Sequence, residues 1–171
     1  MKELKKLIRD VPDFPKKGII FKDITTLLKD KKGFKQAIDS LAAIFKNMKV
    51  DKVAAVESRG FVLGAPLAYK LGAGFILIRK KGKLPYKTVR QSYQLEYGTD
   101  ILEIHKDAIK PGEKVLIIDD LLATGGTIVA TTALLEKLGA KIAGIGFLIE
   151  LSFLNGRKKL KGYNMKSLIK Y

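Results

Sequence analysis

Short apolar runs alternate with helix-like stretches along most of the chain, and this alternation constrains the fold more than any other feature. An apolar run of four to eight residues bounded by turn residues fits a strand that is buried on both faces. Four strands are expected on this basis, at Lys52–Ser58, Gly74–Arg79, Lys114–Ile118 and Lys141–Glu150, and a turn-rich segment at Pro12–Gly18 leads into Ile19–Phe21. Strands that alternate with helices predict an α/β fold, in which a central, mostly parallel sheet is flanked by helices on both faces.

The helices between these strands are marked by the residues at their ends. Asp30 can cap the first long helix through its side chain. Two further helices are expected at residues 59–72, closed by Gly72, and at residues 127–138, followed by Gly139. Alternating residues on either side of a later glycine, at Gln91–Tyr97 and Asp100–Ile104, predict a β-hairpin around Gly98.

The length and composition favour one soluble domain. A chain of 171 residues is long enough to bury a proper core, and without cysteine it has neither a disulfide scaffold nor a thiol-ligated metal site. The first residues carry charge but lack the apolar segment of a signal peptide. The longest apolar run, Ile142–Ile149, is far shorter than the ~20 residues of a membrane helix. We therefore expect a cytoplasmic protein with no membrane partner.

The formal net charge of +16 has three interpretations. A strongly basic surface supplies nonspecific affinity for nucleic acids. However, the lysines are spread from Lys2 to Lys170, and no nucleic-acid-binding motif accompanies them. A general preference for lysine, or a local site for a polyanionic small molecule, also accounts for the charge. We expect no nucleic-acid partner.

One stretch, VLIIDDLLATGGT (Val115–Thr127), joins an apolar strand, two adjacent acids and a glycine-rich turn that enters a helix. The N-terminus of a helix offers unpaired amides, and glycines allow an anion to approach the backbone closely. Asp119 and Asp120 cannot bind phosphate, but carboxylates accept hydrogen bonds from sugar hydroxyls. The stretch therefore predicts a sugar-phosphate site, although an ordinary capped turn is the structural alternative for its glycine-rich part.

Other polar segments fall at the same edge of the expected sheet. In open α/β sheets, ligands bind beyond the carboxyl ends of the strands. The Glu-Ser-Arg-Gly segment (57–60) and the basic loop KKGKLP (80–85) follow two such strands, and the acid pair follows a third. We expect these three segments to form one site.

The acid pair and its turn resemble the phosphoribosyl-pyrophosphate signature of the type I phosphoribosyltransferases. Further segments resemble the adenine-specific family among these enzymes, in order along the chain: PDFPKKGIIFKDIT (Pro12–Thr25), ESRGF (Glu57–Phe61), LIRKKGKLP (Leu77–Pro85) and SYQLEYG (Ser92–Gly98). The resemblance covers the whole chain and implies the type I phosphoribosyltransferase fold in a single domain, residues 1–171. It implies a base-binding segment at residues 1–30, and a mobile loop and hairpin over the site at residues 81–104.

The resemblance also implies an activity. Enzymes of this family carry out purine salvage, converting adenine and 5-phosphoribosyl 1-pyrophosphate (PRPP) into AMP and pyrophosphate. Their cofactor is Mg²⁺, which we expect to be held mainly by PRPP and water, with no dedicated protein ligands. A homodimer is implied as well. The alanine at position 123 points to adenine, because hypoxanthine-guanine enzymes carry an aspartate there that acts near the purine N7.

The matched motifs imply a role for each site residue. Asp119 and Asp120 hold the ribose hydroxyls of PRPP. The 5′-phosphate-binding residues are Ala123, Thr124, Gly125, Gly126 and Thr127, and the pyrophosphate-binding residues are Ser58, Arg59, Gly60, Arg79, Lys80 and Lys83. Phe21 stacks on adenine, while main-chain groups of Ile20 and Lys22 read its amino edge. Glu96 and Arg59 are the catalytic residues, and Glu96 exchanges a proton with the base or stabilises charge there.

Several alternatives stay open. Glu96 also fits an exposed hairpin position, and Tyr93 and Tyr97 fit packing positions of the same hairpin. We assign no role to His105, the single histidine. A phosphoribosyltransferase for xanthine or a pyrimidine is the nearest rival activity. A transcription regulator that keeps the PRPP site is the rival from another class, but we expect no added DNA-binding domain, because the fold begins at about Met1.

Overall fold

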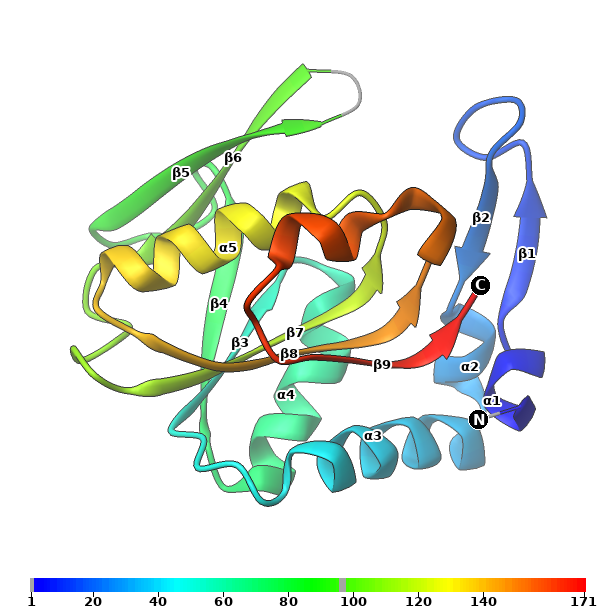
Figure 1. Cartoon of the computed structure of the whole chain (residues 1–171), viewed down its shortest axis with the longest axis horizontal. Helices are drawn as coiled ribbons and strands as arrows, with labels where there is room; N and C mark the ends of the chain where they lie inside the picture. The colour runs from blue at the N-terminus through cyan, green and yellow to red at the C-terminus, as the bar shows by residue number, and fades with distance from the viewer. Residues whose placement is uncertain (1, 96–97) are drawn as a thin grey trace.

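The centre of the molecule is a twisted β-sheet. The computed structural model describes residues 2–95 and 98–171, and in them the central sheet has seven strands in the order β5-β6-β4-β3-β7-β8-β9. Five neighbouring strands run parallel: β4 (Gly74–Lys80), β3 (Lys52–Val56), β7 (Lys114–Leu122), β8 (Lys141–Glu150) and β9 (Met165–Lys170). The mostly parallel sheet predicted from the sequence is confirmed (Figure 1).

The other two strands form the predicted hairpin. β5 (Thr88–Leu95) and β6 (Gly98–His105) are antiparallel, and β6 attaches the pair to the edge of the sheet through the last residues of β4. The hairpin begins three residues earlier than the alternation of the sequence indicated. Glu96 and Tyr97, at its turn, lie outside the described residues.

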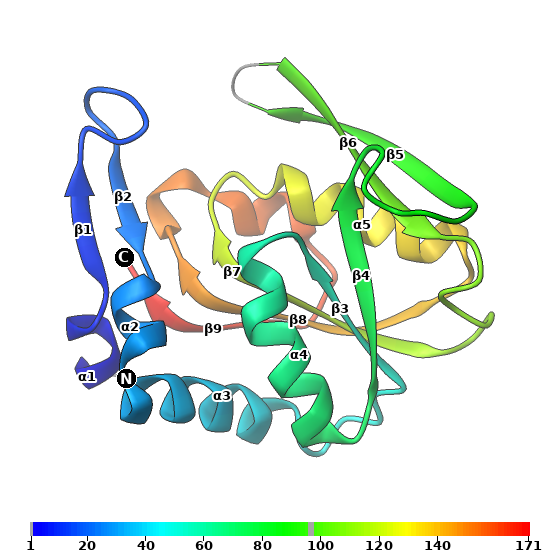
Figure 2. The same ribbon diagram turned by 180° about the vertical axis from the view of Figure 1, so that it is seen from behind.

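A smaller, separate sheet stands on the opposite side of the molecule. After a short helix α1 (Lys2–Lys6), β1 (Arg9–Pro12) pairs with β2 (Ile20–Asp23) in an antiparallel hairpin. Figures 1 and 2 show this hairpin standing apart from β5 and β6, next to α2 and the end of β9. The two hairpins thus flank the central sheet.

Helices cover both faces of the sheet. The longer ones are α3 (Lys31–Phe45), α4 (Arg59–Leu71) and α5 (Gly126–Lys137); α2 (Thr25–Lys29) and the 3₁₀ turns η1 (Ser152–Leu154) and η2 (Gly156–Leu160) are short. Asp30 caps α3 as predicted, because its Oδ1 accepts a hydrogen bond from the Gly33 amide at 2.6 Å. Gly72 ends α4 in the left-handed conformation, with φ +66°. No helix in the described ranges is long and apolar enough to cross a membrane.

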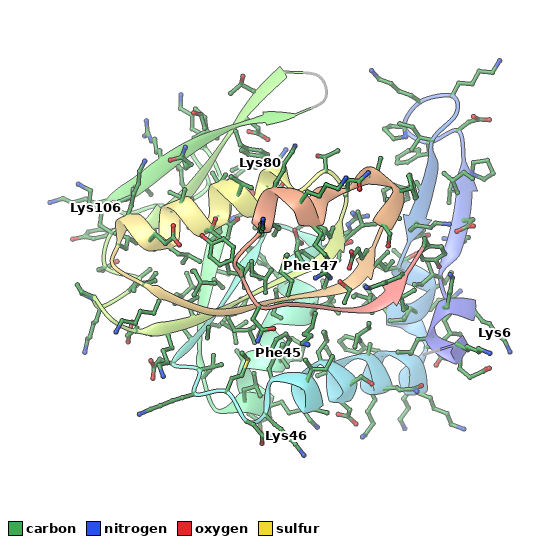
Figure 3. All side chains as sticks on the ribbon, in the orientation of Figure 1. Lys6, Phe45, Lys46, Lys80, Lys106 and Phe147 are labelled. Carbon is green, nitrogen blue, oxygen red and sulfur yellow. The ribbon has the colours of Figure 1, made fainter. Side chains whose placement is uncertain are left out.

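The core lies in two layers, one on each face of the sheet. Leu116 and Ile118 of β7 pack with α3 and α4, whereas Val115 and Ile117 of the same strand pack with α5 and η2. Figure 3 shows the two layers through the side chains of Phe45 on α3 and Phe147 on β8, which lie on opposite sides of the ribbon of the sheet. Burial on both faces explains why these strands are apolar throughout.

Among the parallel strands, β3 and β7 differ most from the prediction at their ends. β3 ends at Val56, so that Glu57 and Ser58 form a turn. β7 continues to Leu122, since its pairing with β8 extends through Asp119 opposite Phe147 and Leu122 opposite Glu150. The prediction that the strand stops at Ile118 was wrong because hydrogen bonding to a neighbouring strand leaves no mark in the local apolar pattern. β1, α2 and the edge strand β9 were not predicted, since each is short or mixes polar and apolar residues.

Candidate active site

A cleft of about 400 Å³ opens at the carboxyl edge of the parallel strands. This volume is typical of small-ligand sites, which span roughly 300–1,000 Å³. Its walls come from the ends of β3 and β7, the beginnings of α4 and α5, and the β5–β6 hairpin: Val56, Glu57, Ser58, Arg59, Lys80, Tyr93, Leu102, Asp119, Asp120, Leu121, Ala123 and Thr127. The acid pair, the 57–60 segment and the start of the basic loop therefore meet in one place, as the sequence predicted.

The two acids lie close together at the floor of the cleft. Asp120 is buried, only 5% exposed, and its amide donates a hydrogen bond to Asp119 Oδ1 at 2.9 Å. Burial and the neighbouring charge of Asp120 raise the pKa of Asp119 well above its ordinary value. Burial also raises the pKa of Asp120, although the guanidinium of Arg59 opposes this shift. Ionising both carboxylates in this buried place costs free energy. Carboxyl groups with pKa values perturbed in this way are typical of functional sites.

Gly60 lets the start of α4 approach the acids. A Cβ added at this residue would lie 3.0 Å from Asp119 Oδ1 and 3.3 Å from the carbonyl oxygen of Ile118. Any larger residue would have to push the acid strand and the helix apart. In the turn before α4, the peptide bond between Glu57 and Ser58 is cis.

Arg59 connects the acid pair with the N-terminal hairpin. Its Nε lies 2.9 Å from Asp120 Oδ2, and its Cζ lies 4.9 Å from the centroid of the Phe21 ring. A guanidinium over an aromatic face is attracted by the ring quadrupole. Through this one side chain, a residue predicted to contact adenine is connected to the residues predicted to hold ribose.

The glycine-rich turn enters α5 without a side-chain cap. Gly125 is the N-cap residue, has φ +83°, and makes no side-chain capping hydrogen bond. A Cβ at this residue would lie 2.8 Å from the carbonyl oxygen of Gly156, so glycine is required by both conformation and space. The first amides of α5 are thus left for another acceptor, and the helix dipole favours an anion there.

The turn does not contribute all of its residues to the same surface. Ala123 and Thr127 line the cleft, whereas Gly126 lines a neighbouring groove between α5 and the hairpin. Thr124 belongs to neither lining, although it lies in the same turn.

The basic residues of the site form specific ion pairs that the sequence did not indicate. Lys80, labelled in Figure 3, lines the cleft. Its Nζ lies 3.1 Å from Asp100 Oδ2, and this carboxylate raises the pKa of the lysine. Arg79 instead pairs through Nε with Glu57 Oε2 at 2.7 Å and donates to the carbonyl oxygen of Lys83 at 3.0 Å. Of the predicted pyrophosphate residues, Ser58, Arg59 and Lys80 line the cleft, while Gly60, Arg79 and Lys83 are outside its lining.

Three side chains of the site were missed by the sequence analysis. Glu57 accepts hydrogen bonds from the Lys80 amide, at 2.8 Å, and from Arg79; although burial raises its pKa, these bonds outweigh that effect and lower it. Asp100 holds Lys80, and Tyr93 lines the cleft and interacts with Asp100 and Thr127. Glu57 and Tyr93 lie within the matched motifs ESRGF and SYQLEYG. Their place in these motifs was the sequence feature that could have indicated a role in the site.

The predicted base residues lie on β2, outside the lining of the cleft. Phe21 meets Phe14 edge-to-face, with ring centroids 5.1 Å apart, and Ile20 is exposed. Lys22 is buried, and its Nζ lies 2.7 Å from Asp10 Oδ1. Glu96, the predicted catalytic acid, lies outside the described residues.

The described residues offer no cluster of three or more His, Cys, Asp or Glu side chains that could hold a metal ion. Asp119 and Asp120, near the end of β7, are the carboxylates that line the cleft together with Glu57. Oxygen ligands of this kind suit Mg²⁺, which usually keeps several waters and binds through one or two carboxylates and substrate phosphates.

Comparison with known proteins agrees with this geometry. Residues 24–169 match the family described as the phosphoribosyl transferase domain. The adenine phosphoribosyltransferase of Alkaliphilus metalliredigens is 61% identical over 164 residues, covering 96% of each chain. The chain belongs to the adenine phosphoribosyltransferase family.

Solved structures of this family superpose closely on the chain. The enzyme of Thermoanaerobacter pseudethanolicus has a TM-score of 0.97 at 59% identity and covers 99% of both chains. The enzyme of Saccharomyces cerevisiae, in complex with adenine and an imino-altritol bisphosphate, has a TM-score of 0.91 at 40% identity and covers 97% of this chain and 96% of the yeast chain. These matches confirm the type I phosphoribosyltransferase fold predicted from the sequence.

Proposed function

We propose that the chain converts adenine and PRPP into AMP and pyrophosphate in purine salvage, with Mg²⁺ as cofactor. The observation that carries this proposal is the acid pair beside the uncapped N-terminus of α5, with Ala123 between them, in a member of the adenine phosphoribosyltransferase family. The sugar-phosphate site and the missing aspartate at position 123 both fit this reaction.

The ribose 5-phosphate half of PRPP binds across β7 and α5. Asp119 and Asp120 accept hydrogen bonds from the ribose hydroxyls, and these bonds stabilise the ionised form that burial disfavours. The 5′-phosphate lies on the turn from Ala123 to Thr127, where free amides and a left-handed Gly125 surround it. The same carboxylates stabilise the positive charge that develops on the ribose carbon as pyrophosphate leaves.

The pyrophosphate half lies against the 57–60 segment and the basic loop. Arg59 and Lys80 line the cleft and neutralise the leaving group, with the residues from Ser58 to Gly60 beside it. Arg79 and Lys83 stabilise this loop, because the guanidinium of Arg79 donates hydrogen bonds both to Glu57 and to the carbonyl oxygen of Lys83. Mg²⁺, held mainly by PRPP and water, supplies further charge neutralisation when bound.

Adenine lies against the N-terminal hairpin. Phe21 offers an apolar face next to Arg59, and the main chain of Ile20 and Lys22 reads the amino edge of the base. Glu96, carried over the site by the loop at residues 81–104, exchanges a proton with the base or stabilises charge there. Full activity of a Glu96→Gln variant would remove this residue from the mechanism.

We further propose a cytoplasmic homodimer. α4 begins within the 57–60 segment, and exposed apolar side chains lie on it and on the adjacent strand β4, namely Val62, Tyr69 and Leu77. Tyr69 is 90% exposed near the C-terminal end of α4, and Val62 lies one turn from Arg59 at the start of this helix. A partner that covers both side chains would therefore extend from the far end of α4 toward the site. Sedimentation of the wild type and of Tyr69→Glu tests this part: a monomeric wild type contradicts it.

A spectrophotometric assay with PRPP, Mg²⁺ and each purine in turn tests the proposed reaction. Adenine is expected to be consumed, with AMP and pyrophosphate formed in equal amounts, and hypoxanthine, guanine and xanthine are expected to react far more slowly. A folded, Mg²⁺-supplied sample that does not turn over adenine contradicts the proposal. Faster turnover of another base would overturn the assignment to adenine alone.

A further inference from the structure

The strand that carries the proposed adenine residues is not hydrogen-bonded to the central sheet. In the described ranges, β2 pairs with β1 alone. A two-stranded hairpin is marginally stable by itself, so side chains that reach the rest of the molecule must fix its position. Lys22 is the one residue of β2 that is buried, at 8% exposure, and it therefore points from the hairpin toward the body of the protein.

Lys22 contacts an aromatic ring at the edge of the central sheet. Its Nζ lies 4.0 Å from the centroid of the Tyr171 ring and 2.7 Å from Asp10 Oδ1. Tyr171 follows β9 directly; its amide donates to the carbonyl oxygen of Glu150 at 3.0 Å, and its own carbonyl accepts from the Ser152 amide at 2.9 Å. Figure 2 shows β2 next to the end of β9. The ring is thus held by the main sheet, and Lys22 links the hairpin to it.

The position of Lys22 determines where the base-contacting groups lie. Successive side chains of a strand point to opposite faces, so when Lys22 turns toward Tyr171, Phe21 turns the other way. The contact of Phe21 with the guanidinium of Arg59, at 4.9 Å, lies on that other side. A shift of Lys22 would therefore move both the ring of Phe21 and the main chain of β2 relative to the cleft.

We propose that Lys22 is a positioning residue for adenine, which acts through its contact with Tyr171 and is separate from any main-chain reading of the base. The inference rests on the proposed function. Lys5 provides a matched control, because its Nζ also lies 4.0 Å from the Tyr171 ring centroid, yet it belongs to α1 and donates to the carbonyl oxygen of Lys170. Loss of Lys5 removes an equivalent contact with the ring without changing β2.

The test compares Lys22→Met, Lys22→Arg, Lys5→Met and Tyr171→Leu. Because the contact of Lys22 with the Tyr171 ring fixes β2, the KM for adenine is expected to rise about tenfold in Lys22→Met and Tyr171→Leu, which corresponds to about 1.4 kcal/mol. The KM for PRPP should stay within about twofold of the wild-type value. Lys22→Arg, which keeps the positive charge, should have most of the wild-type affinity for adenine, and Lys5→Met should match the wild type. Circular dichroism and thermal unfolding verify that each variant is folded; if Lys22→Met is not, the Tyr171→Leu and Tyr171→Phe pair carries the comparison.

Calorimetric binding of AMP and of ribose 5-phosphate provides a readout without turnover. The affinity for AMP, which contains the base, should fall in Lys22→Met, while the affinity for ribose 5-phosphate should not change. An unchanged KM for adenine, or an equal loss for both substrates, would overturn the inference. Failure of the proposed function gives a different result, because the wild type itself would then neither turn over adenine nor bind AMP.

Discussion

The two halves of the proposed site are built in different ways. The ribose-phosphate half lies on β7 and the start of α5, inside a sheet that is covered on both faces. The base half lies on the β1–β2 hairpin, a separate two-stranded sheet joined to the body by side chains such as Lys22 and Arg59. In the proposed site, the charged ribose phosphate would bind to the central sheet, and the flat, uncharged base would bind to a hairpin that side-chain contacts connect to it. Changes to the first half should affect PRPP binding and folding, and changes to the second should affect adenine alone.

The largest effect is expected from Asp119→Asn. Removing one preorganised charge from a site of this kind lowers kcat/KM about 100- to 1,000-fold. Because the folded protein raises the pKa of Asp119, its carboxyl favours folding below its ordinary pKa, and this contribution is lost as the pH rises through the folded pKa. The variant should therefore lose activity and yet unfold at a higher temperature than the wild type at pH 8.

Thermal unfolding at pH 5 and pH 8, together with turnover, verifies both parts of this prediction. The difference in unfolding temperature should be larger at pH 8. Asp107→Asn is the control, since this exposed turn residue lies outside the cleft lining and should change neither quantity. An Asp119→Asn variant that is active, or less stable at pH 8, contradicts the account.

Gly156→Ala should displace the turn from Ala123 to Thr127, the proposed 5′-phosphate site, because Gly156 packs against its backbone. A Cβ at this residue would lie 2.1 Å from the carbonyl oxygen of Ala123 and 3.0 Å from the Gly125 amide. Overpacking of this kind typically costs about 1–3 kcal/mol, so the KM for PRPP should rise roughly 30-fold while the KM for adenine changes little. Gly144→Ala is the matched control, because its Cβ would meet its neighbours at an ordinary 3.4 Å. Equal KM values for PRPP in the two variants would disprove the close packing of the turn.

Glu150→Gln should weaken the support beneath the same turn. Glu150 pairs with Arg157, next to Gly156, and accepts from Ser167; these hydrogen bonds, led by that of Arg157, lower its pKa to about 2. A lowered folded pKa stabilises the protein above the ordinary value of 4.5, and this stability is lost as the pH falls toward 2. We expect the variant to lose about 1–2 kcal/mol at pH 7, after allowance for the partly exposed arginine.

Urea unfolding at pH 7 and pH 3 measures this difference, which should shrink at the lower pH. Asp39→Asn serves as the control, since Asp39 pairs with two lysines on the surface and its loss should matter less. A Glu150→Gln variant with a larger deficit at pH 3 than at pH 7 would contradict the assigned direction.

Phe21→Leu should give the smallest effect and only on the base side. It removes an aromatic face worth about 1 kcal/mol, so the KM for adenine should rise about fivefold. The KM for PRPP and the unfolding temperature should stay close to those of the wild type, because the hairpin is not part of the central sheet. A comparable rise in the KM for PRPP would show that the two halves are not separate.

The same contrast explains how much could be predicted from the sequence. The ribose-phosphate half is formed by residues that are adjacent in the sequence, because an apolar run, two acids and a glycine-rich turn follow one another from Val115 to Thr127. Their common position at the cleft therefore follows from the direction of one strand. The fold was predictable for a similar reason, because burial on both faces leaves continuous apolar runs. The end of β7 was wrong because pairing with β8 extends this strand through the acids, and the short or mixed elements β1, α2 and β9 were not predicted.

The base half depends on contacts between distant residues. Nothing near Lys22 indicates that its side chain meets Tyr171, 149 positions away, or that Arg59 lies over Phe21. The pairing of Arg79 with Glu57 also joins different strand ends and was invisible to motif reasoning. Packing of remote segments fixes these contacts, and the local sequence carries no record of it.

A crystal structure of the chain with AMP and pyrophosphate tests the division of the site most directly. The account predicts the 5′-phosphate on the turn from Ala123 to Thr127, the ribose hydroxyls on Asp119 and Asp120, and the base against Phe21. Pyrophosphate should lie beside Arg59. A nucleotide whose ribose lies away from the two acids, or whose base does not touch the β1–β2 hairpin, would contradict it.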